Sequence, residues 1–158
     1  MSAISVQPHK SSIGGLDANV MALIAYLAST VLAWIPGIRY VAWLAPLVIF
    51  FLEKDSLFVK FHAMQSFALN AVGTIFYFIV AVLIGGIALA SITSASGAYA
   101  ALGIMGVVTA ITFIISIVFT IFAIIAMVRA YQYKEYRIPL VARIADKLIV
   151  LFGGVAAK

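Results

Sequence analysis

A long stretch without formal charge determines which kind of fold this sequence can adopt. After Lys60 there is no Asp, Glu, Lys or Arg until Arg129. As a helix, residues 61–128 would be roughly 100 Å long at 1.5 Å per residue, and a bilayer core is about 30 Å thick, so in lipid they have to cross it twice. The chain is 66% hydrophobic and 9% charged, whereas a soluble domain carries about 25% charged residues. The sequence therefore predicts a membrane protein and excludes a soluble enzyme, a nucleic-acid-binding domain and a disordered linker.

The charged positions divide the chain into four predicted helices. We expect them at about residues 18–35, 40–53, 62–90 and 101–130. The uncharged run of the second helix, Tyr40–Leu52, is shorter than the ~20 residues that a span needs, so this helix is a short tilted span or part of a re-entrant hairpin. Trp34 and Trp43 flank the turn before it, and because aromatic residues gather at the membrane–water boundary, this placement favours a span.

The predicted fold class is an all-α membrane protein: a bundle of four transmembrane helices, the second one short, with a C-terminal amphipathic helix at the interface. Residues 1–15 contain Pro and Gly and no apolar periodicity, which predicts a flexible cytoplasmic tail rather than a cleavable signal peptide. Residues 16–136 form the predicted transmembrane domain. In residues 137–158, apolar side chains recur at helical spacing opposite Arg143 and Lys147, which predicts an amphipathic helix on the cytoplasmic surface or, alternatively, one packed against the ends of the spans.

The positions of Lys and Arg predict the orientation in the membrane. Nine of the ten lie on one predicted side, and only Arg39 lies on the other. Because cytoplasmic loops carry the excess of Lys and Arg, both termini are predicted to be cytoplasmic, with the basic side chains near anionic lipid headgroups. The nine residues are Lys10, Lys54, Lys60, Arg129, Lys134, Arg137, Arg143, Lys147 and Lys158.

Weakly polar side chains recur on one face of three predicted helices. They are Asn19, Tyr26 and Thr30 on the first helix; His62, Ser66, Asn70, Gly73 and Tyr77 on the third; and Thr109, Thr112, Ser116 and Thr120 on the fourth. We expect these stripes to face one another, either as a polar path or as helix packing. Packing is favoured because small and hydroxyl residues are the usual material of helix interfaces in membranes. No charged residue lies mid-span, which disfavours a proton or ion relay.

His62 lies at the predicted entrance of the third helix, where a histidine can titrate near neutral pH. The only other histidine is His9 and there is no cysteine, so no metal site is predicted. Phosphate-loop, dinucleotide-binding and hydrolase motifs are absent, so we expect neither a cofactor nor catalytic residues. We expect His62 to make a structural hydrogen bond to Asp17, Asn19 or Gln65.

Three segments of the chain resemble a small family of bacterial membrane proteins. They are residues 16–20 followed by 22–27, residues 52–55 with 58–66, and Ala130-Tyr131-Gln132 with Ile138-Pro139 and Ile144-Ala145. The most specific string is Phe58-Val59-Lys60-Phe61-His62-Ala63-Met64-Gln65-Ser66. The family is Tic-twenty-like and is usually classed as a domain of unknown function. It is similar to an inner-envelope component of the chloroplast import machinery and includes magnetosome membrane proteins of the MamF type.

The resemblance implies a four-helix bundle in a bacterial inner membrane that acts as a non-enzymatic scaffold or assembly factor. The alternative is a subunit of a protein-translocation or transport complex, which needs an oligomer or a partner to form a lumen. The implied partners are the lipid bilayer with its anionic headgroups, a second copy or another membrane protein, and no nucleic acid. The candidate contact residues are Lys54, Phe58, Lys60, Phe61, His62, Gln65 and Ser66. In a structural alternative, Phe58, Phe61 and Met64 anchor the chain in the interface while Lys54 and Lys60 contact phosphates.

Overall fold

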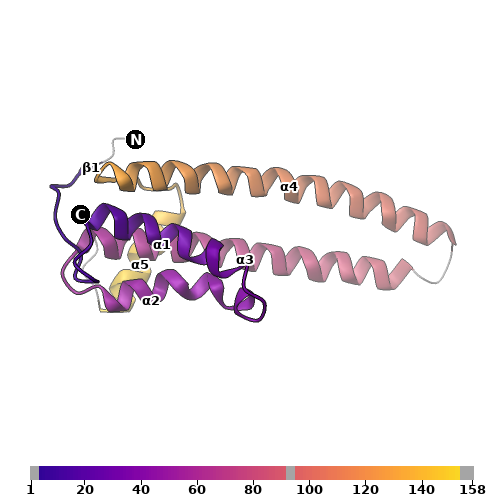
Figure 1. The fold of residues 1–158 in the computed structure, drawn as a ribbon. Helices are drawn as coiled ribbons and strands as arrows, with labels where there is room; N and C mark the ends of the chain where they lie inside the picture. The colour runs from indigo at the N-terminus through magenta and orange to yellow at the C-terminus, as the bar shows by residue number, and fades with distance from the viewer. Residues whose placement is uncertain (1–3, 92–94, 154–158) are drawn as a thin grey trace. The chain divides into compact units, whose positions relative to one another are not determined.

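The computed structural model describes residues 4–91 and 95–153, and these are mainly helical (Figure 1). The elements are β1 (Ile4–Ser5), α1 (Ala18–Leu32), the 3₁₀ helices η1 (Ile38–Tyr40) and η2 (Ala42–Leu44), α2 (Ala45–Leu52), α3 (Leu57–Ser91), α4 (Ala95–Tyr131), β2 (Lys134–Glu135) and α5 (Val141–Leu151). Apart from the two short strands, the expectation of a helical protein is confirmed. The chain divides into two compact units: the first holds the residues up to Val72 and from Phe122 onward, and the second holds Gly73–Ile121.

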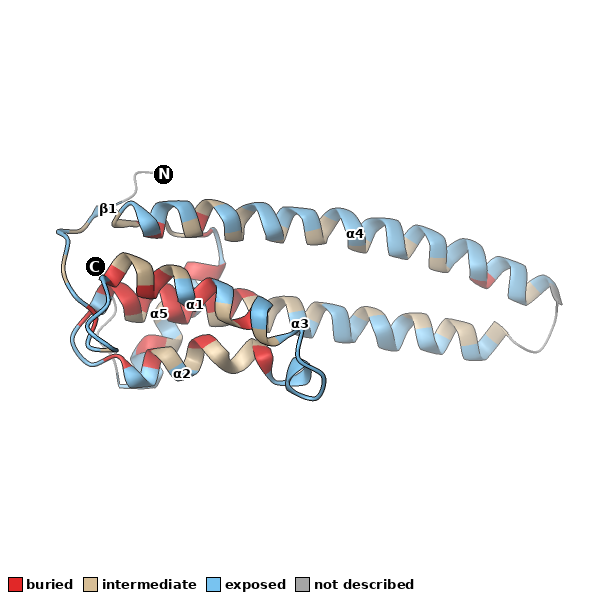
Figure 2. Cartoon of the chain, in the orientation of Figure 1, coloured by how far each residue is buried: buried red, intermediate tan, exposed pale blue. Residues whose placement is uncertain are grey.

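The core of the first unit lies where α1 packs on the first half of α3. Ala18, Ala22 and Ala25 recur at helical spacing on α1 and are completely buried, and such small side chains let another helix approach closely. On α3, nearly every residue from Phe58 to Leu69 is buried. Figure 2 shows the buried residues concentrated in the elements of this unit. Because complete burial of a large apolar side chain is worth about 1.5–3 kcal/mol, this interior is the main source of the unit's stability.

The turn between α1 and α2 makes the second helix shorter than predicted. Gly37 has φ +85°, a left-handed conformation that glycine adopts without strain. The residues after it wind into 3₁₀ turns, so α2 begins at Ala45 rather than at residue 40. Pro46 occupies the first turn of α2, where its missing N–H needs no partner.

The lengths of α1 and α2 leave the prediction of four spans unconfirmed. At 1.5 Å per residue, the 15 residues of α1 and the 8 residues of α2 give about 22 Å and 12 Å. Both lengths are below the ~30 Å of a bilayer core. Among the described residues, two helices are long and apolar enough to cross a membrane, α3 and α4. The structure therefore supports an all-helical chain with two candidate spans.

The second unit consists of the second half of α3 and most of α4. Many of its large apolar side chains are exposed, as at Phe78 (69%), Leu89 (70%) and Leu102 (65%). An apolar surface of this kind in a helix without charges is typical of a segment that lies in lipid.

Both long helices begin earlier than predicted. α3 begins at Leu57 rather than at residue 62, because the Ser56 hydroxyl oxygen accepts a hydrogen bond from Val59 N at 3.1 Å and caps the helix. α4 begins at Ala95 rather than at residue 101. The alanines of residues 95–101 favour a helix, and residues 92–94, between the two predicted helices, lie outside the described residues.

The N-terminal segment from residue 4 is held to the first unit, which corrects the prediction of a flexible tail. β1 pairs antiparallel with β2, so that Ile4 lies opposite Glu135. Val6 N donates to Tyr133 O at 2.8 Å, and Lys10 forms an ion pair with Asp17. The partners of this segment come from the far end of the chain, which a local pattern does not reveal.

α5 confirms a helix within residues 137–158. Val141, Ala145 and Ile149 are buried on one face, while Arg143 and Lys147 are exposed. Protein covers this part of the apolar face, which agrees with the packed alternative, while the apolar side chains of Ile144 and Leu151 are exposed.

Candidate functional site

Gln65 is the centre of a buried polar network in the first unit. Its side chain is completely buried. Its Nε2 donates to Tyr26 Oη and to Tyr136 O, both at 2.9 Å. Its Oε1 accepts from Ile138 N at 3.0 Å. One amide thus ties α1, α3 and the segment before α5 together, and a buried amide with partners on both ends is a stabilising arrangement.

His62 continues this network through Tyr26. Its Nδ1 lies 3.1 Å from Tyr26 Oη. Because Gln65 already donates to that oxygen, the Tyr26 hydroxyl donates to Nδ1, which assigns a neutral imidazole with its proton on Nε2. Nε2 is buried and makes no hydrogen bond of standard geometry with the described residues. His62 thus makes a hydrogen bond, but its partner is Tyr26 rather than Asp17, Asn19 or Gln65.

We expect His62→Gln to retain membrane insertion and function while lowering stability by about 1–2 kcal/mol. Glutamine can still accept from Tyr26, but it loses the ring contacts with Phe58 and Phe61, whose centroids lie 4.6 and 5.3 Å from the imidazole. Thermal unfolding in detergent measures the loss. Abolished function with unchanged unfolding would contradict a structural role.

Glu53 forms a second buried polar centre, at the turn between α2 and α3. The carboxylate is 1% exposed. It accepts from the hydroxyls of Ser11 and Ser12 and from the backbone N–H groups of Ser12, Asp55 and Ser56. Burial alone would raise the pKa of Glu53, but the hydrogen bonds from Ser11, Ser56 and Ser12 outweigh it and lower the pKa to about 2. An ionised side chain therefore fastens the N-terminal segment to the turn.

Three further side-chain contacts stabilise this end of the first unit. Arg137 forms an ion pair with Asp146 and lies over the Phe61 ring at 5.1 Å, which fixes α5 to α3. His9 Nε2 lies 2.7 Å from the Ser56 hydroxyl.

Burial raises the pKa of Glu135, although the nearby Arg137 opposes this shift.

Five of the seven candidate contact residues are inside the protein. Phe58, Phe61, His62, Gln65 and Ser66 are all at most 2% exposed. The alternative prediction, that Phe58, Phe61 and Met64 anchor the chain in the interface, is wrong for the same reason. Protein covers these side chains and leaves them no access to lipid. Of the other two, the Lys54 side chain is exposed, and Lys60 Nζ donates to Lys54 O at 3.2 Å.

The polar stripes of α1 and α3 serve helix packing. Ser66 donates to Ala25 O at 2.9 Å, and Asn70 donates to Ser29 Oγ at 3.0 Å. Of the predicted α1 stripe, Tyr26 is buried, whereas Thr30 is exposed and Ser29 takes its place in the contact with α3. Asn19, also predicted in the stripe, donates to Tyr131 O at 2.9 Å.

The stripe of α4 lies in the second unit. Ser116 and Thr120 donate to carbonyl oxygens of their own helix, Phe113 O and Ser116 O. Thr109 is exposed and Thr112 is half-buried. That the stripes of three helices face one another stays a prediction.

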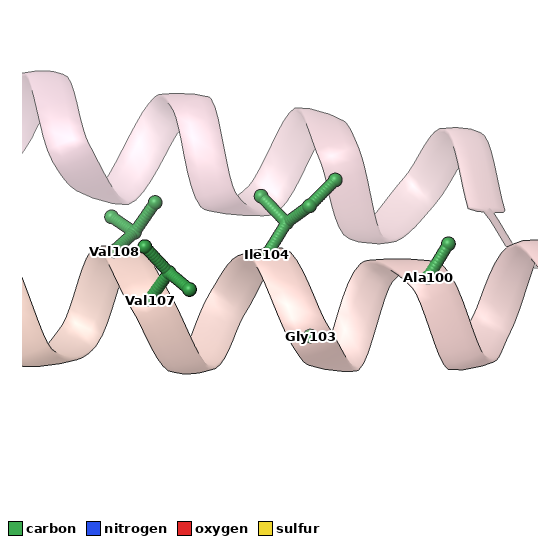
Figure 3. Close-up of a pocket in the computed structure, with 5 residues that line it drawn as sticks. All are labelled: Ala100, Gly103, Ile104, Val107 and Val108. Carbon is green, nitrogen blue, oxygen red and sulfur yellow. The ribbon is translucent and has the colours of Figure 1, made fainter.

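An open apolar hollow runs along α4 in the second unit (Figure 3). Its lining residues are Ala100, Gly103, Ile104, Val107 and Val108. None of them has a polar side chain, so the hollow offers no group for acid–base or nucleophilic chemistry. Within the described residues there is also no group of three or more His, Cys, Asp or Glu side chains placed to hold a metal ion.

Sequence reasoning missed Glu53, Ser11 and the Arg137–Asp146 pair. Glu53 stands in a charged cluster after an apolar run, a pattern typical of a solvated turn. The available signal was Ser56 directly before the helix, because an N-cap serine marks a turn with an ordered backbone.

The three sequence segments that carry the family resemblance interlock in the first unit. Tyr26 of the first segment contacts His62 and Gln65 of the second. Gln65 in turn accepts a hydrogen bond from the backbone of the third at Ile138. Residues that carry the resemblance therefore pack together in this unit.

Comparison with known proteins gives one family. Residues 17–145 match the family model MamF_MmsF, described as the magnetosome magnetite crystal formation protein family. No curated protein and no solved structure matches the chain.

Proposed function

This chain belongs to the MamF_MmsF family of magnetosome magnetite crystal formation proteins, and from that membership we propose that it is a non-enzymatic membrane scaffold or assembly factor in magnetite crystal formation. The observation that carries the proposal is that the chain divides into two units of different character. The exposed apolar helices of the second unit suit lipid, while the first unit holds a buried hydrogen-bond network. A scaffold needs both a stable attachment to the membrane and a fixed surface.

The polar groups of the first unit support a role without catalysis. Glu53 accepts five hydrogen bonds from the protein itself, and Gln65 uses both ends of its amide. A general base has to reach a substrate proton, whereas the Glu53 carboxylate is buried and fully engaged and the Gln65 amide is not basic. Substrate turnover by the purified protein would contradict this part of the proposal.

The proposed location is a bacterial inner membrane or a membrane derived from it, with both termini cytoplasmic. The excess of Lys and Arg in the first unit supports this orientation. Exposed side chains such as Lys54 and Lys147 are suited to anionic headgroups.

The Tic-twenty-like relation is part of the proposal, supported by the three interlocking segments. A translocation or transport role would require an oligomer or a partner to supply a lumen. The side chains expected to line such a path, including Ser66 and Asn70, instead form hydrogen bonds between helices, so the scaffold role is preferred.

Gene deletion and complementation in a magnetosome-forming bacterium test the proposal. We expect deletion to change the size or shape of the crystals in electron micrographs, and the tagged chain to fractionate with magnetosome membranes. Complementation with the intact gene should restore the crystals. Unchanged crystals, or a chain absent from that fraction, would contradict the proposed role.

A further inference from the structure

The turn from Trp34 to Trp43, here named the aromatic tip, exposes large side chains at one end of the first unit. Trp34 is 85% and Tyr40 is 77% exposed, and the Arg39 guanidinium lies 5.9 Å from the Tyr40 ring. The tip contains both tryptophans of the chain. Tryptophan, tyrosine and arginine with an apolar body and a polar end are typical of the headgroup level of a bilayer.

Contacts with α3 fix how far the aromatic tip reaches along that helix. Trp43 stacks on Phe67 at 5.7 Å between ring centroids. Ser29, just before the tip, receives the hydrogen bond from Asn70. Ser29 is therefore level with Asn70, so the tip lies close to where the first-unit part of α3 ends, and the part of α3 from Leu57 to Asn70 measures only about 20 Å.

The remainder of α3 has the length of a bilayer core. Residues 73–91 carry no charge and give about 28 Å of helix, with exposed apolar side chains such as Ile75 (60%) and Val82 (57%). The complete 35-residue helix is about 52 Å long, roughly 20 Å more than the hydrocarbon. One part of it therefore lies outside the hydrocarbon. The part covered by protein does not need lipid, whereas the exposed apolar part does.

From these observations we infer that the aromatic tip docks into the headgroup–acyl boundary of the leaflet on the side of the termini, and that α1 and α2 do not cross the membrane. The inference rests on the proposed membrane attachment through the second unit. It places Arg39 on the same side as the other nine Lys and Arg residues, opposite to the sequence-based expectation.

Single cysteines test the side on which the tip lies, because the chain has no cysteine of its own. The variants are Ile38→Cys in the tip, Lys147→Cys in α5 and Ala98→Cys at the start of α4, all at exposed positions. A membrane-impermeant maleimide is applied to intact cells and to inverted membrane vesicles. We expect Ile38→Cys and Lys147→Cys to react from the same side and Ala98→Cys from the other.

The labelling outcomes separate the two proposals. Reaction of Ile38→Cys from the side of Ala98→Cys, or from neither side, overturns the docking of the tip and leaves the membrane attachment intact. Reaction of Ala98→Cys from the side of Lys147→Cys overturns the membrane-crossing second unit itself.

Tryptophan fluorescence tests the depth of the tip. Trp43→Phe retains a ring to stack on Phe67 and leaves Trp34 as the only tryptophan. The variant is reconstituted in phosphatidylcholine–phosphatidylglycerol vesicles with bromines placed near the glycerol or near the chain ends. We expect the bromines near the glycerol to quench Trp34 fluorescence at least about twofold more strongly than the bromines near the chain ends, because Trp34 lies at the interface. Equal quenching, stronger quenching by the deep bromines, or no quenching overturns the docking.

Discussion

Glu53→Ala is expected to destabilise the first unit by about 3–5 kcal/mol. The substitution removes the acceptor for five donors, from Ser11, Ser12, Asp55 and Ser56, at a turn where Glu53 itself is 1% exposed. For a chain of this size such a loss lowers the unfolding temperature by about 10 °C. Thermal unfolding in detergent measures the change, and limited proteolysis should show earlier cleavage in the N-terminal segment.

The exposed neighbour Asp55 provides the matched control. Asp55→Ala removes a carboxylate from the same turn while retaining the backbone N–H that binds Glu53, so we expect a change within about 0.5 kcal/mol. Equal effects of the two substitutions would show that loss of charge in the turn, rather than the hydrogen bonds of Glu53, causes the destabilisation.

The contribution of Glu53 is expected to disappear in acid. Its pKa is about 2 in the folded chain against 4.5 as the ordinary value, so ionised Glu53 stabilises the fold above about pH 4.5, and this stabilisation is lost as the pH falls toward 2. The stability difference between the natural chain and Glu53→Gln should therefore shrink over that interval. Unfolding measured at several pH values checks this, and a constant difference between pH 7 and pH 2 would contradict it.

Much of the fold follows from the sequence because its strongest signals are long. The charge-free stretch between Lys60 and Arg129 predicts two long helices, and α3 and α4 are found there. The short elements were less predictable. The 3₁₀ turns after Gly37 and the pairing of β1 with β2 depend on backbone conformation and on partners distant in the sequence, which neither hydropathy nor local propensity records.

The candidate site was located more accurately than it was interpreted. The string from Phe58 to Ser66 lies in the centre of the first unit, but an apolar pattern alone does not distinguish a side chain that faces lipid from one that faces protein. Phe61 and Gln65 point inward because α1 and the segment before α5 cover them, and this packing is visible only in the structure. Glu53 escaped notice because an acidic residue in a charged turn is ordinarily solvated, and its donors at Ser11 and Ser12 come from a segment expected to be flexible.

Gln65→Leu is expected to destabilise the first unit by about 3 kcal/mol although it preserves the approximate volume of the side chain. Leucine offers no partner to Tyr136 O or Ile138 N, which Gln65 now binds at 2.9 and 3.0 Å, and each buried backbone group without a partner costs about 1–3 kcal/mol. The exposed Gln132→Leu is the control and should change stability by no more than about 0.5 kcal/mol. Thermal unfolding in detergent compares the two.

A double-mutant cycle with Tyr26→Phe tests whether these groups form one network. Tyr26 Oη joins Gln65 to His62, so removing the hydroxyl already breaks one of the bonds that Gln65→Leu breaks. The loss in the double variant should then be smaller than the sum of the two single losses by about 0.5–3 kcal/mol. Strict additivity would mean that Gln65 and Tyr26 act independently. In that case α1 would be held to α3 by apolar packing and by the Ser29–Asn70 and Ala25–Ser66 bonds alone.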